Sequence, residues 1–197
     1  MKHSERAADI FFSQVVESDP WFYVPYWIKD FRHDGCGLIS LVLCVDLLTG
    51  KELTPLDAYY IRQEAGLDQR NEANKEGTSV CGGDVTLRLN PVNRRLFGIE
   101  SRPLERSVEA FREVLSREGS VIWASSRNCD FIDNAGVRRF HQDGHVIMFW
   151  KYENGLYYAK DCGHRKEMGN NVPYTEEFLR EWLAGTERQQ FEIVRAE

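Results

Sequence analysis

The most informative segment of this chain is Gly35-Cys36-Gly37-Leu38-Ile39-Ser40-Leu41-Val42-Leu43-Cys44-Val45-Asp46-Leu47-Leu48-Thr49-Gly50. From Leu38 onwards the apolar positions surround a helix almost completely, which is typical of a central, buried helix. We expect the helix to end at Thr49, because Gly50 suits the left-handed position that follows many helices. Cys36 therefore stands between two glycines at the start of a buried helix.

This position makes Cys36 a candidate nucleophile. The N-terminus of a helix carries unpaired N–H groups and a partial positive charge, which stabilise a thiolate, and flanking glycines let a substrate backbone approach closely. Taken alone, Cys36 fits equally well a small apolar residue that caps a core helix. Cys44, two turns further along, is expected to lie in the core.

Outward from this helix, the pattern predicts helices in the first part of the chain and strands afterwards. We expect, in order, a short helix over 10–16, an extended aromatic segment over 21–27, a helix from Thr54-Pro55 to about 65, a polar loop over 68–83, a helix over 104–117, a strand over 120–124, a hairpin over 146–161, a helix over 173–183 and a strand over 191–194. The layout predicts an α+β fold in one domain, residues 1–197.

The hairpin carries the second candidate group. His145 opens its first strand, Glu153-Asn154-Gly155 predicts the turn, and Asp161 ends the second strand. The head of one strand lies beside the tail of its partner, so Asp161 is placed to orient His145 through a ring N–H. A nucleophile, a base and an orienting carboxylate thus occur in positions that could converge, although Asp161 also fits a simple turn former. His164 is expected at the surface.

Several segments resemble a known family. Residues 34–41, followed by 47–51 and Thr54-Pro55, are similar to the nucleophile helix of the bacteriocin-processing (double-glycine leader) peptidase-like group of papain-like cysteine peptidases. Residues 144–147 and 158–161 resemble its histidine and aspartate strands, and 174–179 with Trp182 resemble its closing helix. The resemblance covers about 20–184 and is loose over 68–100. It implies a papain-like α+β fold, in which an N-terminal helical part with the nucleophile helix packs on a C-terminal antiparallel sheet.

The resemblance also implies roles for residues. Cys36 would be the nucleophile of a thioester mechanism, His145 the general base and then the general acid, and Asp161 the orienting group. The family commonly holds the oxyanion with a glutamine ahead of the cysteine, and residues 27–33 contain none. Lys29, Arg32 and His33 are the candidate donors there, beside the backbone N–H of Cys36.

Three functions remain open at this point. The first is a thiol hydrolase that cleaves a peptide or isopeptide bond. The second uses the same triad for acyl transfer to an amine, as transglutaminase-like relatives of the fold do. The third is a catalytically silent module that binds a peptide, which the missing glutamine favours. All three predict a peptide or protein partner; the oligomeric state stays open.

Composition and charge exclude other classes. The 197 residues are 42% hydrophobic and 28% charged, which excludes a disordered tail or a collagen, and the net charge of −6 argues against a nucleic-acid partner. The five cysteines are an odd number without Cys-x-x-Cys spacing, so we expect no disulfide framework, no metal and no cofactor. The sequence contains neither the apolar core of a signal peptide nor a membrane span, which predicts a soluble, cytoplasmic protein; secretion by another route stays open.

Overall fold

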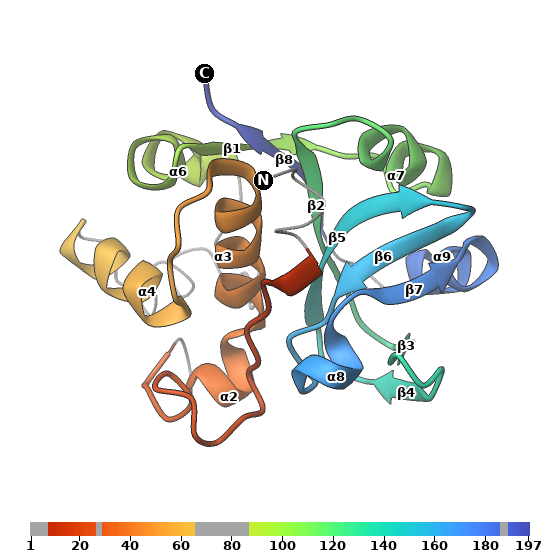
Figure 1. The fold of residues 1–197 in the computed structure, drawn as a ribbon, viewed down its shortest axis with the longest axis horizontal. Helices are drawn as coiled ribbons and strands as arrows, with labels where there is room; N and C mark the ends of the chain where they lie inside the picture. Colours follow the sequence, from red (N-terminus) through yellow and green to blue (C-terminus); the bar gives the residue numbers. More distant parts are fainter. Residues whose placement is uncertain (1–7, 27–28, 66–86, 186–188) are drawn as a thin grey trace.

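The computed structural model describes residues 8–26, 29–65, 87–185 and 189–197 (Figure 1). The loop predicted over 68–83 lies outside these ranges. The described elements are α2 (Phe31–Asp34), α3 (Cys36–Thr49), α4 (Pro55–Glu64), η2 (Leu87–Leu89), α6 (Asn90–Phe97), β1 (Ile99–Pro103), α7 (Val108–Leu115), β2 (Ser120–Ser126), β3 (Cys129–Ile132), β4 (Arg138–His141), β5 (His145–Glu153), β6 (Leu156–Lys160), α8 (Lys166–Gly169), β7 (Val172–Thr175), α9 (Glu176–Leu183) and β8 (Gln190–Arg195).

In the described part of the chain, six strands form one antiparallel sheet in the order β1-β8-β2-β5-β6-β7. The strands β3 and β4 form a separate antiparallel pair. The last strand, β8, lies between β1 and β2 and pairs with both, so the end of the chain is held inside the sheet. The predicted strands at 120–124 and 191–194 are confirmed as β2 and β8.

The sheet separates two apolar cores. On one face, α3 packs against β2 and β5, and its buried side chains meet Trp123, Met148 and Ile193. On the other face, α7 and α9 pack over Phe149 and Tyr174. Figure 1 shows the two layers on opposite sides of the sheet, with α3 and α4 on one side and α7 and α9 on the other. Alternating residues of β5 therefore face different helices.

The buried helix predicted to follow Gly35 is confirmed as α3. Residues 36–47 of α3 are buried throughout, as an apolar surface on all sides requires, and the helix ends where Gly50 adopts φ 73°. The helix of Thr54-Pro55 is confirmed as α4, and Thr54 and Asp57 form a reciprocal capping box at its start.

Three of the predicted helices differ from the structure. Residues 10–16 are not helical, because the side chains of Ser13 and Gln14 bond to other segments of the chain. The helix predicted over 104–117 is α7 only, since Ser107 caps it from an extended conformation. The helix predicted from 173 begins at Glu176, because residues 172–175 pair with β6 as strand β7.

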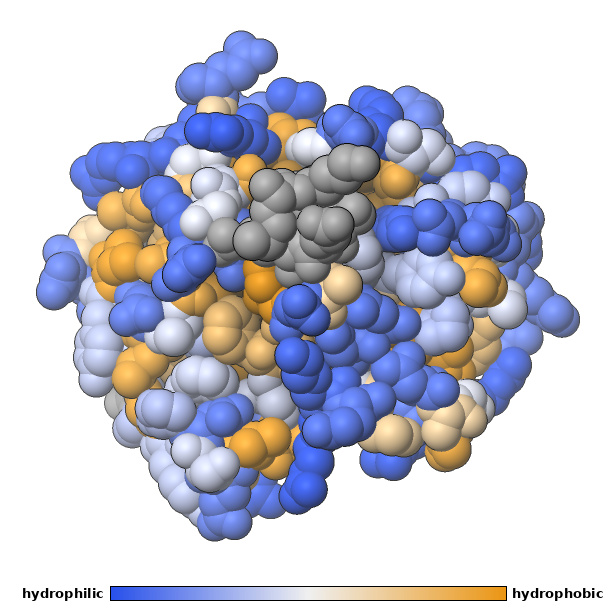
Figure 2. Space-filling view, in the orientation of Figure 1, coloured by the Kyte–Doolittle hydropathy of each residue, from blue (hydrophilic) through white to orange (hydrophobic). Residues whose placement is uncertain are grey.

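The surface is mainly hydrophilic on the face shown in Figure 2, and apolar residues show most on the side of α4. Among the described residues, no helix is both long and apolar enough to cross a membrane.

Candidate functional site

Cys36 is the first residue of α3, and only 2% of its surface is exposed. Side-chain hydrogen bonds from the helix and the sheet fasten this first turn in place. Trp123 Nε1 on β2 donates to the carbonyl oxygen of Gly37 at 3.1 Å, and Ser40 Oγ donates to the carbonyl oxygen of Val146 at 3.4 Å. The sheet therefore fixes the position of the Cys36 backbone.

The glycine before Cys36 is required by a close approach of the chain. A Cβ atom at Gly35 would lie 2.5 Å from the carbonyl oxygen of Phe31, which is closer than any non-bonded contact allows. The short helix α2 therefore runs almost directly into α3, and Gly35 serves as the C-cap of the first and the N-cap of the second.

His145 and Asp161 lie in direct contact. His145 Nε2 is 2.6 Å from Asp161 Oδ1, and both side chains are buried. The same oxygen accepts a hydrogen bond from the backbone N–H of Gly163 at 2.9 Å. An ionised carboxylate only accepts, so Nε2 carries the proton and Nδ1 is the ring nitrogen left for another group.

A bulge in the hairpin makes this contact possible. Near the turn, β5 and β6 pair in the register of a two-residue loop, and continued regularly this would place Asp161 opposite Met148. Asp161 would then lie on the opposite face of the sheet from His145, since side chains alternate. The register shifts by one residue at Trp150, Met148 pairs with Lys160 instead, and Asp161 comes to the face of His145.

Neighbouring groups stabilise the ionised form of Asp161. Burial alone would raise the pKa of Asp161, but the charge and hydrogen bond of His145, the charge of His164 and the N–H of Gly163 outweigh burial and lower the pKa below its ordinary value. Asp161 Oδ2 has no hydrogen-bond partner among the described residues, and His164 Nε2 lies 3.7 Å from it. Asp161 is therefore held in its ionised form beside the two histidine rings.

The prediction that His164 lies at the surface is wrong. Its exposed fraction is 7%, because the loop after Asp161 turns back under α8 and the segment at Ser13. Ser13 Oγ donates to the carbonyl oxygen of His164 at 2.9 Å, and a Cβ at Gly169 would lie 3.0 Å from the Cβ of His164.

Cys162 and Gln14 connect the parts of the site. Cys162 Sγ lies 3.9 Å from the carbonyl oxygens of both Cys36 and Val146, and 3.4 Å from Gln14 Oε1. Gln14 also donates through its backbone N–H to the carbonyl oxygen of Cys162 at 2.8 Å and through Nε2 to the carbonyl oxygen of Arg32 at 2.7 Å. One buried glutamine thus joins the loop of Asp161 to the segment that leads to Cys36.

The sequence prediction did not single out Gln14 or Cys162 for the site. The only available signal was the polar side chain of Gln14 within an otherwise apolar run. The structure brings the Cys36 backbone beside the strand of His145; the contact between the Cys36 thiol and the His145 ring stays a prediction.

The three candidate oxyanion donors lie ahead of Cys36 with other neighbours. The guanidinium of Arg32 lies 5.4 Å from the centre of the Phe22 ring. His33 Nδ1 is 2.7 Å from Asp30 Oδ1, with 44% of the His33 side chain exposed. Lys29 is exposed, and its backbone N–H donates to Asp34 Oδ2 at 2.7 Å. Their role at an oxyanion stays a prediction.

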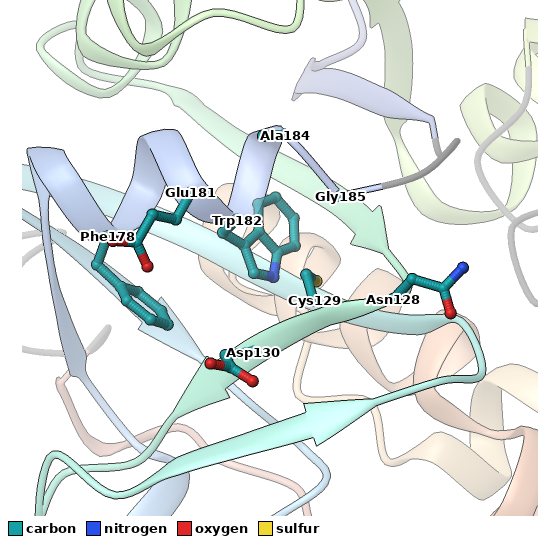
Figure 3. A pocket seen from close by; sticks show the side chains of 8 residues that line it. All are labelled: Asn128, Cys129, Asp130, Phe178, Glu181, Trp182, Ala184 and Gly185. Atoms are coloured by element: carbon teal, nitrogen blue, oxygen red, sulfur yellow. The ribbon is translucent and has the colours of Figure 1, made fainter.

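Two further kinds of site, a metal site and a pocket, concern the described ranges. No group of three or more histidine, cysteine or acidic residues there is arranged to hold a metal ion. A small pocket of about 180 Å³ lies between the start of β3 and the end of α9 (Figure 3). It is lined by Cys129 and Trp182 among others, and it contains none of Cys36, His145 and Asp161.

Comparison with known proteins supports the architecture. Among solved structures, the chain is similar to a "putative C39-like peptidase" from Bacillus anthracis, with a TM-score of 0.52 and 16% sequence identity over 95% of this chain and 96% of that one. The two chains share a fold. No family model and no curated protein matches the sequence. The predicted α+β class, with an antiparallel sheet covered by helices, is therefore confirmed, and the bacteriocin-processing subtype stays a prediction.

Proposed function

We propose that this protein is a papain-like thiol hydrolase that cleaves a peptide or isopeptide bond. The observation that carries the proposal is the 2.6 Å contact between His145 Nε2 and Asp161, which leaves Nδ1 of the same ring for a thiol. Cys36 begins a helix of 14 residues, where the unpaired N–H groups favour a thiolate. The fold shared with a C39-like peptidase agrees with this chemistry.

The reaction proceeds in two steps. The Cys36 thiolate attacks the scissile carbonyl carbon, an S–C bond forms, and the C–N bond breaks as His145 gives its proton to the leaving amine. Water then attacks the thioester, His145 accepts a proton from the water, and the C–S bond breaks to release a carboxylic acid. Asp161 holds the ring orientation and stabilises the imidazolium in both steps.

Cleavage of a peptide library in H₂¹⁸O tests this proposal. We expect wild-type protein to generate new termini, with ¹⁸O in each new carboxyl group, and Cys36→Ala to generate none. Cys44→Ala is the matched control, because Cys44 lies two turns along the same helix and is fully buried in the core. Equal cleavage by Cys36→Ala would contradict the proposal. Hydroxamate products in the presence of hydroxylamine, formed faster than the acid, would favour the acyltransferase.

A catalytically silent peptide-binding module is the second candidate. The interactions of Arg32 and His33 with Phe22 and Asp30 favour it, because these side chains are then occupied elsewhere. This function predicts that wild type and Cys36→Ala bind library peptides with equal affinity and that neither cleaves them.

A further inference from the structure

The His145 ring is enclosed by another histidine. His141, the last residue of β4, stacks on His145 with ring centres 5.4 Å apart and an angle of 16° between the planes. Phe131 meets both rings edge-on, with its centre 4.9 Å from that of His141 and 5.2 Å from that of His145.

Two strand pairings bring His141 beside His145. Ser126 pairs with His145 between β2 and β5, and three residues later Cys129 pairs with His141 between β3 and β4. Cys129 Sγ lies 3.2 Å from Ser126 Oγ, which itself donates to the carbonyl oxygen of Trp182 at 3.1 Å. Figure 3 shows α9 lying along the start of β3, where Cys129 and Trp182 are neighbours. The base of the β3–β4 hairpin is therefore fixed to the strand beside His145.

The other sides of the His145 ring are also occupied. Nε2 meets Asp161, and a Cβ added at Gly163 would lie 3.0 Å from both Cε1 and Nε2. His141 thus covers a ring face that the backbone and the carboxylate leave open. Without it, the edge of Phe131 would be the remaining aromatic contact of the imidazole on the side of the hairpin.

The charge state of His141 suits this position. Burial and the charge of His145 lower the pKa of His141; the charges of His164 and Arg139 act in the same direction, and that of Asp161 acts against them. A neutral ring is attracted to an imidazolium face, whereas a second cation at this distance repels it.

We propose that His141 is a positioning residue, whose neutral ring holds the His145 imidazole so that Nε2 meets Asp161 and Nδ1 stays available to Cys36. This inference rests on the proposed function. It predicts that the reaction needs an uncharged aromatic ring at position 141, and that protonation of His141 in acid disturbs the alignment of His145.

Two variants separate the ring from its charge. We expect His141→Phe to keep kcat within about threefold of wild type and to lose less activity below about pH 6, because nothing titrates at position 141. We expect His141→Ala to lower kcat about tenfold or more with KM unchanged, since small misplacements of a catalytic group are costly. Phe140→Ala is the matched control, because Phe140 is the neighbouring residue on the same strand and is 65% exposed. Thermal unfolding checks that each variant is folded.

Nitrogen NMR of the imidazoles tests the position of His145 without any substrate, with His145→Gln used to assign its signals. Wild type and His141→Phe should show one tautomer with the proton on Nε2, and His141→Ala should show averaged nitrogen shifts. Identical His145 signals in all three proteins would overturn the inference, as would an unchanged kcat in His141→Ala or a loss confined to KM. If the wild type cleaves no peptide, the proposed function fails, and the spectra still decide the role of His141.

Discussion

Adding one methyl group beside the His145–Asp161 pair should reduce activity more than stability. In Gly163→Ala, the new Cβ would lie 3.0 Å from Cε1 and Nε2 of His145 and 3.1 Å from Asp161 Oδ1. Ordinary carbon contacts are about 3.5–4.0 Å, so the imidazole or the carboxylate must retreat by roughly 0.5 Å. The backbone of Gly163 accepts alanine, since it has no positive φ.

The size of the effect follows from this displacement. A misplacement of about 1 Å at a reacting group costs roughly 10²-fold in rate, so about 0.5 Å is expected to cost roughly tenfold in kcat. Overpacking of this kind destabilises a protein by about 1–3 kcal/mol. Gly119→Ala is the matched control, because its φ of 80° makes alanine unfavourable by about 1–2 kcal/mol while no atom lies within 4 Å of the new Cβ.

The assay is kcat on a library peptide that the wild type cleaves, together with the free energy of unfolding in urea. We expect Gly163→Ala to lose about tenfold in kcat and Gly119→Ala to lose stability alone. Wild-type kcat in a folded Gly163→Ala protein, with the His145 nitrogen signals displaced, would refute the view that the 2.6 Å contact positions the base.

Three further predictions concern buried polar groups. Asp161→Asn should unfold more easily at pH 7 than wild type, and its stability should depend less on acid. Because the folded state lowers the pKa of Asp161, the stabilisation is present above the unfolded pKa of about 3.9 and is lost as the pH falls through the folded pKa. Urea titrations from pH 7 to 3 measure this, and parallel stability curves for both proteins would contradict it. Burial lowers the pKa of Lys160 to about 7, so above pH 7 the unfolded chain binds more protons than the folded one. The free energy of unfolding of wild type, relative to that of Lys160→Met, should therefore rise by up to about 1.4 kcal/mol per pH unit from pH 7 to 9. A difference that does not change with pH would show that Lys160 stays charged. Gln14→Ala removes the 2.7 Å hydrogen bond to the carbonyl oxygen of Arg32 and should cost about 0.5–1.5 kcal/mol by urea unfolding. No measurable change in the free energy of unfolding would mean that the link across the site is not needed.

The helix of Cys36 and the hairpin of His145 follow from local patterns. An apolar surface on all sides fixes α3, and Asn154-Gly155 fixes the turn, because both residues adopt positive φ there. These signals lie within a few residues of the structure that they specify.

The contact between His145 and Asp161 depends on a feature that the pattern does not show. The hairpin turn alone implies the regular register, in which the two side chains lie on opposite faces of the sheet. The shift at Trp150 corrects this, and it lies outside the residues of the turn. The hairpin pattern therefore predicts that His145 and Asp161 are neighbours, but the bulge that lets their side chains meet has no signal in the turn residues.

The remaining parts of the site depend on contacts between distant segments. Gln14 reaches the loop of Asp161 from 148 residues away, and Ser13 reaches His164 from 151 residues away. The helical spacing over 10–16 is misleading for this reason, since tertiary hydrogen bonds override a short local pattern. The stack of His141 on His145 likewise requires the pairing of β3 with β4, two strands of only four residues each.

The pH dependence of Cys36 alkylation tests whether His145 holds Cys36 as a thiolate. Iodoacetamide is added to wild type and to His145→Ala between pH 5 and 9, and peptide mass spectrometry gives the rate at Cys36 alone. An ordinary thiol, with a pKa of about 8.5, reacts about ten times more slowly for each pH unit below that value. We predict that the wild-type alkylation rate stays nearly constant from pH 8 to 6. In His145→Ala we predict that the rate at Cys36 falls about tenfold for each pH unit. The same tenfold fall in the wild type would contradict a thiolate paired with His145.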